Sequence, residues 1–176
     1  SPGWCVLKWS FCGGVVCPSG TDCISINGTE RCADPCEHYS IINDEWRSVN
    51  YTRSGPYHDD YDVPREGWYR MFLGESNARI PDWCVSRFSC GTLNSFWMAQ
   101  PNPTEYGRIF KSDVYCMYPS NCYDERSYDM HVKLCYGNYY VYKLQPPKLG
   151  PSAYCAGNEW SNIQPEAGRW PSKVLC

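Results

Sequence analysis

A histidine and three aspartates stand within five positions of the sequence, at His58, Asp59, Asp60 and Asp62. Carboxylates at this density suit a calcium ion or the acidic half of a catalytic site. An EF-hand loop also needs a glycine turn and a closing glutamate in register, whereas here a valine and a proline follow directly. A nonclassical calcium site at Asp60 and Asp62 stays open. We expect instead a hydrated acidic loop between two strands.

Catalysis by an activated nucleophile has little support in the sequence. The three histidines are His38, His58 and His131, and no G-x-S-x-G elbow presents a serine. Cysteines that are mostly bridged cannot act as thiolates. We therefore expect a protein that is not an enzyme, with no catalytic residue, no cofactor and no metal beyond the two aspartate candidates above.

Aromatic residues offer a second kind of site. Eight tryptophans and 15 tyrosines occur in 176 residues. Rings can stack on the C–H face of a sugar, so an exposed platform would make the protein a lectin or a small-molecule carrier. The candidates are Trp46, Trp68, Trp97, Trp160 and Trp170. In a disulfide-rich chain that has few aliphatic residues, core packing is the more ordinary use of tryptophan.

Thirteen cysteines are the strongest compositional signal. No pair shows the two-residue gap of a zinc knuckle, so we infer a disulfide framework and a secreted, extracellular chain. The odd count leaves at least one thiol free or bonded to another chain, which could produce self-association. A net charge of −3 disfavours nucleic acid and anionic membranes, and no apolar run is long enough to span a bilayer. The Ser1-Pro2-Gly3 start is typical of a processed chain.

Two sequons, at Asn27 and Asn50, could carry N-linked glycans, whereas the look-alike at Asn102 is blocked by proline. The fold class we predict is mainly β and disulfide-rich: a small stapled hairpin followed by one compact β-rich domain with minor helix. The domains would be a hairpin region 1–36 of EGF-like size, a main domain 37–155 and a loop-rich tail 156–176.

Local patterns place the expected elements. Asn27-Gly28 between alternating residues predicts a hairpin turn within 12–36. Aromatic or alternating runs predict strands at 67–73, 82–90, 129–136 and 138–144, the last two joined as a hairpin. The stretch 38–48 could be a short helix or a strand.

The motifs "CADPCEHYSIINDEWRS", "GWYRM", "CVSRFSC", "FWMAQPNP", "HVKLC", "YYVYKL" and "AYC" occur in this order. In that order they resemble the decoy module of the uromodulin and pancreatic glycoprotein 2 family, a disulfide-rich hairpin followed by an eight- or ten-cysteine domain. The resemblance covers residues 12 to 155. It implies the disulfide pairs Cys12–Cys23, Cys17–Cys32, Cys36–Cys135 and Cys90–Cys155.

A fifth bridge, Cys84–Cys122, is also implied by the resemblance. In the family this segment holds two adjacent cysteines, whereas here Cys122 is followed by Tyr123. Either Cys84 or Cys116 should therefore lose its family partner. The resemblance leaves Cys5, Cys116 and Cys176 unplaced.

This sequence departs from the family pattern in two further places. Two cysteines that bond each other in the family are absent, and Tyr61 and Gly150 occupy their places. The family glycan that follows the Trp97-Met98 pair is lost as well, because Ala99 stands in its position.

The resemblance implies binding or assembly in matrix, mucus, egg coat or host defence. The implied partners are extracellular glycoproteins, glycans or microbial adhesins. The sequence contains no recognisable polymerising domain of the family, so we expect a fragment or a free-standing module.

Overall fold

A computed structural model describes residues 5–6, 9–52, 54–61, 65–116, 128–148 and 150–158, with the side chains of 5, 6 and 128 left out. In this part of the chain one ten-stranded sheet has the order β13-β9-β10-β11-β12-β7-β8-β14, with β1 paired to β10 and β6 to β7. The strands of this sheet are β1 (Cys5–Val6), β6 (Ser40–Ile42), β7 (Gly67–Leu73), β8 (Ser76–Arg79), β9 (Asn94–Met98), β10 (Ile109–Tyr115), β11 (Tyr128–Cys135), β12 (Tyr139–Leu144), β13 (Ser152–Tyr154) and β14 (Gly157–Asn158).

The pairing is mainly antiparallel, and only β13 on β9 and β6 on β7 run parallel within the described residues. The predicted strands at 67–73, 129–136 and 138–144 are confirmed as β7, β11 and β12. β11 and β12 also form the expected hairpin, in which Cys135 lies opposite Tyr139. The mainly β, disulfide-rich fold class is therefore confirmed.

Alternating side chains give the large sheet two different faces. On one face Met71, Val132 and Tyr142 lie in the main core, fully buried. The other face carries a smaller cluster of Trp68, Ile109, Cys135 and Val141. Because successive side chains of a strand point to opposite faces, each of these strands contributes to both layers.

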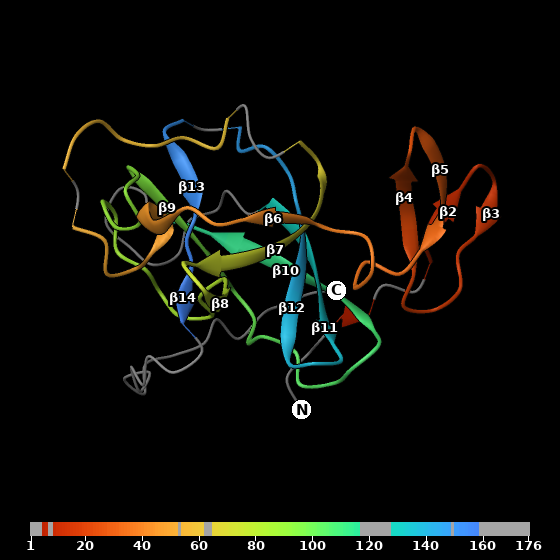
Figure 1. The fold of residues 1–176 in the computed structure, drawn as a ribbon. Coiled ribbons are helices and arrows are strands. Elements are labelled where there is room, and N and C mark those ends of the chain that lie inside the picture. The colour runs from red at the N-terminus through yellow and green to blue at the C-terminus, as the bar shows by residue number, and fades with distance from the viewer. Residues whose placement is uncertain are drawn as a thin grey trace.

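A small stapled unit covers the second face. It contains two two-stranded ribbons, β2 (Phe11–Cys12) with β3 (Val15–Val16) and β4 (Asp22–Ile26) with β5 (Thr29–Ala33). The strands of this unit lie to the right of the large sheet in Figure 1. The structure thus has two short hairpins where the sequence predicted one. The turn of the second hairpin has φ of 51° at Asn27 and 77° at Gly28, as a type I′ turn requires.

One predicted strand is wrong. The stretch 82–90 is irregular, and Phe88 and Cys90 adopt left-handed backbone angles of 66° and 56° that no strand tolerates. The undecided stretch 38–48 contains both alternatives, β6 and the 3-10 turn η1 (Glu45–Arg47). β1 belongs to the large sheet rather than to the stapled unit, so domain boundaries at 36 and 155 remain a proposal. Among the described residues, no helix is long and apolar enough to cross a membrane.

Candidate functional site

The acidic loop at residues 58–61 is an anchor in the core. Asp60 is 1% exposed, and its carboxylate receives two hydrogen bonds from the guanidinium of Arg47, at 2.7 and 2.6 Å. The backbone N–H of Tyr154 donates a third, at 2.9 Å. Arg47, 2% exposed, also donates to Asp44 and to the carbonyl of Tyr154. We call this set the Arg47–Asp60 anchor; it ties η1 and the 58–61 loop to β13.

Burial acts on both partners of this pair. It would lower the pKa of Arg47, but the hydrogen bonds and charge of Asp60 outweigh it, so the pKa of Arg47 is raised. For Asp60, burial outweighs Arg47 and raises the pKa of the carboxyl. The fork-to-fork geometry with a third N–H donor is that of a carboxylate, so we take the pair as ionised at neutral pH.

The hydrated-loop expectation is therefore wrong at Asp60, and calcium has poor access there. Both carboxylate oxygens of Asp60 already accept hydrogen bonds from a cation, which a Ca²⁺ ion would have to displace. The second metal candidate, Asp62, lies outside the described residues. Sequence reasoning missed Arg47 because a single arginine in a short turn shows no signal of burial.

The neighbouring Asp59 fills the place of the absent family bridge. Its Oδ1 accepts from the backbone N–H groups of Tyr61 and Ser152, at 3.0 and 3.2 Å. A Cβ atom added at Gly150 would lie 2.7 Å from Asp59 Oδ2. The two segments that a cysteine pair would link are thus held side by side by a carboxylate and a glycine.

Replacing Gly150 with alanine is expected to destabilise the protein by about 1–2 kcal/mol, because the Asp59 carboxylate must move away from Ser152. Gly67→Ala is the matched control, since its added methyl would meet its nearest atom at an ordinary 3.6 Å. Thermal unfolding of both variants tests this. Equal melting temperatures for the two would contradict the role assigned to Asp59.

The tryptophan platform is not assembled. Trp68 and Trp97 are each 5% exposed, and Trp68 donates its indole N–H to Asp22 at 2.8 Å. Trp46 is half-buried and stacks on His58, with ring centroids 4.3 Å apart, while Arg47 lies 4.2 Å from its centroid. These three tryptophans pack the interior, so they present no sugar-binding face. Trp160 and Trp170 lie outside the described residues.

The three histidines lie in separate places. His38 belongs to the turn before β6, and His58 stacks on Trp46. His131, in β11, stands opposite Lys111 and Lys143 on the flanking strands. Burial lowers the pKa of His131, and the charge of Lys143 lowers it further, which keeps its imidazole neutral near pH 7. The fold does not bring the three together.

Four disulfides have both partners among the described residues: Cys12–Cys23, Cys17–Cys32, Cys36–Cys135 and Cys90–Cys155. They are the same four pairs that the family resemblance implies. Cys84 is also disulfide-bonded, and its proposed partner Cys122 lies outside the described residues. Of the cysteines left unplaced, Cys116 is buried, Cys176 lies outside the described part, and only the backbone of Cys5 is described.

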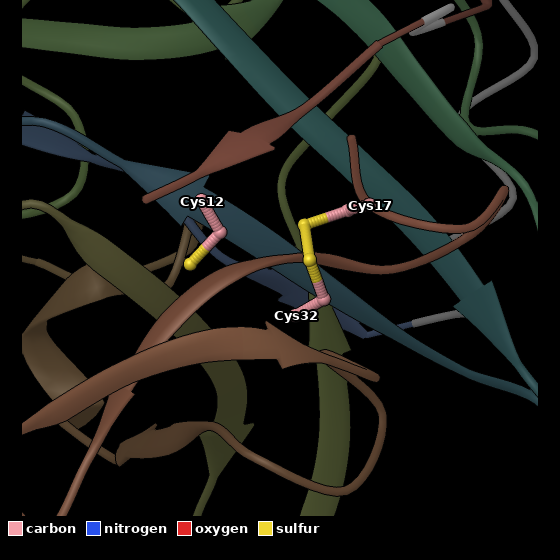
Figure 2. Close-up of side chains that lie close together, drawn as sticks. All are labelled: Cys12, Cys17 and Cys32. Carbon is pink, nitrogen blue, oxygen red and sulfur yellow. A yellow bond between two sulfur atoms is a disulfide. The ribbon is translucent and has the colours of Figure 1, made fainter. Parts of the chain in front are cut away.

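Two of these bridges lie against each other in the stapled unit. The sulfurs of Cys12, Cys17 and Cys32 are all within 4.8 Å of one another. Figure 2 shows Cys17 joined to Cys32, with the sulfur of Cys12 nearby. Because each sulfur is already in a disulfide, none is available as a thiolate ligand for a metal.

Charged side chains dock the stapled unit on the large sheet. Asp22, 3% exposed, accepts hydrogen bonds from Ser10, from the Trp68 indole and from Lys143 at 2.7 Å. Lys133, from β11, donates to the carbonyl of Gly20 at 2.6 Å and to Asp34 at 2.8 Å. Like Arg47, these buried ions have no sequence signal, because their partners lie about 100 or more positions away along the chain.

Acid is expected to weaken this docking. Burial alone would raise the pKa of Asp22, but hydrogen bonds from Lys143, Ser10 and Trp68 outweigh it and hold the pKa below its usual value. The stabilisation is therefore complete above the unfolded-state pKa of about 3.9 and is lost as the pH falls through the lower folded-state pKa.

Denaturant unfolding measured across this acid range checks the prediction. The variant Asp22→Asn should be less stable at neutral pH and show a shallower loss in acid. Asp129→Asn is the control, because Asp129 is 56% exposed in its pair with Lys111. The assignment fails if Asp22→Asn keeps the full acid dependence of the parent protein.

Both sequon asparagines are exposed. Asn27 is the first residue of the β4–β5 turn, and Asn50 follows η1. In contrast, Asn102 is 5% exposed, with its amide bonded to Ile80 and Asp82. Ala99, at the place of the lost family sequon, is 3% exposed.

Taken together, the geometry defines a disulfide-rich β module: a stapled two-hairpin unit locked by ion pairs and a bridge onto a large sheet. Comparison with known proteins agrees. Residues 69–156 match the family model of the uromodulin-like domain that is named for its eight cysteines. The chain is 32% identical over 155 residues to uromodulin from Rattus norvegicus, covering 87% of this chain and 22% of that protein.

A second relative has a different name. Pancreatic secretory granule membrane major glycoprotein GP2 from Mus musculus is 33% identical over 127 residues, which is 70% of this chain and 23% of that protein. The chain therefore belongs to the uromodulin and GP2 family. It spans less than a quarter of the length of these relatives.

Proposed function

We propose that this chain is a secreted extracellular glycoprotein module that binds or assembles with other molecules and has no enzymatic activity. The observation that carries the proposal is the placement of Asn27 and Asn50, both exposed at turns of a framework that disulfides hold rigid. Glycans at such sites are presented outward in a defined orientation. The family membership and the name of the GP2 relative, a glycoprotein, support the same role.

The proposed partners are extracellular glycoproteins, glycans and microbial adhesins that recognise sugar. The settings that fit are matrix, mucus, egg coat or host defence. Self-association is a further part of the proposal, because 13 cysteines cannot all pair within one chain. A lectin or carrier based on the tryptophans has lost its support, since Trp68 and Trp97 are buried.

Expression of the full chain in secretory eukaryotic cells, followed by intact mass analysis, tests the proposal. We expect a mass decrease on enzymatic removal of N-glycans, reduced by one glycan in Asn27→Gln and in Asn50→Gln. Asn102 is the internal negative control, since it is buried and precedes a proline. A secreted protein unmodified at both sites would overturn glycan presentation, and non-reducing analysis would reveal a covalent dimer.

A further inference from the structure

A small cleft lies where the stapled unit meets the large sheet. Its volume is about 230 Å³, below the roughly 300–1,000 Å³ typical for drug-sized ligands, so it suits one monosaccharide-sized group. Three segments enclose it: the chain leaving β5, the loop before β10, and the hairpin end of β11 and β12. The lining residues are Asp34, Cys36, Glu37, Gly107, Lys133, Leu134, Cys135, Tyr136 and Tyr139.

The polar groups of the cleft keep unused hydrogen-bonding capacity. Lys133 is 4% exposed, and its ammonium donates to Gly20 and Asp34, which leaves one of three N–H groups free. Asp34 Oδ1 accepts from Lys133 and from the N–H of Cys36, at 2.8 Å each. Among the described residues, none donates to Asp34 Oδ2. A donor and an acceptor therefore stand side by side.

An oriented aromatic ring borders the cleft. Tyr136 is 81% exposed, yet its ring stacks on Tyr106 with centroids 5.0 Å apart and planes 2° from parallel. Tyr106 is held in turn by a hydrogen bond from its hydroxyl to Asn138. On the opposite wall, Tyr139 donates its hydroxyl to the carbonyl of Cys36 at 3.0 Å. Rings fixed in this way lose little conformational entropy when they bind a ligand.

We propose that this cleft binds a neutral saccharide residue. A sugar hydroxyl both donates and accepts, which matches the adjacent Asp34 Oδ2 and Lys133 N–H, and its C–H face can stack on Tyr136. The buried ammonium of Lys133 disfavours a cationic ligand, while Asp34 and Glu37 disfavour an anionic one. This site goes beyond the proposed function, because it would bind sugar and does not depend on glycans at Asn27 or Asn50.

Saturation-transfer NMR on the full chain, after removal of its own N-glycans, tests the proposal. The neutral probes are methyl α-mannoside, methyl β-galactoside and chitotriose; sialyllactose and lysine methyl ester serve as anionic and cationic comparisons. We expect transfer to the ring protons of at least one neutral probe, with amide shifts at residues 136–139. Tyr136→Ala should weaken binding about two- to tenfold, because it removes the stacking face.

Two further variants separate recognition from folding. Tyr136→Phe keeps the ring and should retain binding, and Tyr61→Ala removes another exposed tyrosine, 62% exposed in the 58–61 loop, and should change nothing. Unchanged melting temperatures would show that all three variants are folded. The proposal is overturned if no neutral probe is saturated, if only a charged probe is, or if Tyr136→Ala binds as well as the parent.

Discussion

Replacing Asp60 with alanine is expected to lower the free energy of unfolding by about 3–5 kcal/mol, the largest effect we expect for any single substitution in this protein. The change leaves Arg47 charged and 2% exposed, without the carboxylate that accepts its two short hydrogen bonds. It also leaves the N–H of Tyr154 without its acceptor. Urea unfolding under non-reducing conditions measures the loss.

Asp44→Ala is the matched control for this experiment. Asp44 accepts from the same guanidinium at 2.9 Å, but its side chain is 44% exposed, so its removal should cost less than about 1 kcal/mol. The double variant Arg47→Met, Asp60→Leu should recover part of the loss by removing both charges. A single Asp60 variant as stable as the Asp44 variant would refute the anchor. A rise in stability with added calcium would instead support the metal site considered for the acidic loop.

Removal of the Cys36–Cys135 bridge, with alanine at both positions, is expected to cost about 4–5 kcal/mol, because in the chain-entropy model a long closed loop strongly restricts the unfolded chain. The bridge spans 99 positions. It also joins the end of the stapled unit to β11, beside the cluster that contains Trp68. Chemical unfolding followed by tryptophan fluorescence reports the change.

The Cys17–Cys32 bridge provides the comparison. It spans 15 positions within the stapled unit, so replacing both cysteines should cost about 3 kcal/mol. The difference between the two losses isolates the effect of loop length from that of losing any disulfide. A smaller loss for the long bridge than for the short one would contradict the assignment. It would mean that Asp22 and Lys133 hold the unit in place without the bridge.

Local patterns predicted the strands that have two unlike faces. β7, β11 and β12 alternate along the sequence because one set of side chains enters the main core and the other meets the stapled unit. The Asn27-Gly28 turn was predictable because few other residue pairs accept left-handed angles at both positions. Alternation misled at 82–90, where left-handed backbone at Phe88 breaks the strand.

The polar residues followed a different rule. The cluster at 58–62 looked solvated because aspartate is usually exposed, and nothing near Asp60 in sequence names Arg47 as its partner. Asp22 and Lys143, 121 positions apart, give no signal of their pairing either. The tyrosines of the small cleft were equally unpredictable, because Tyr106 and Tyr136 meet only through the folding of two loops.

By itself, the sequence determined the mainly β class, the main strands, the disulfide-rich character and, through its ordered motifs, the family. These properties depend on local alternation, turn chemistry and cysteine number, all of which are local features of the chain. The tertiary structure alone decided that Asp60 is a buried anchor, that Trp68 and Trp97 are core, and that Asp59 occupies the place of an absent bridge. Burial and ion pairing are set by residues distant in sequence, so only the folded chain reveals them.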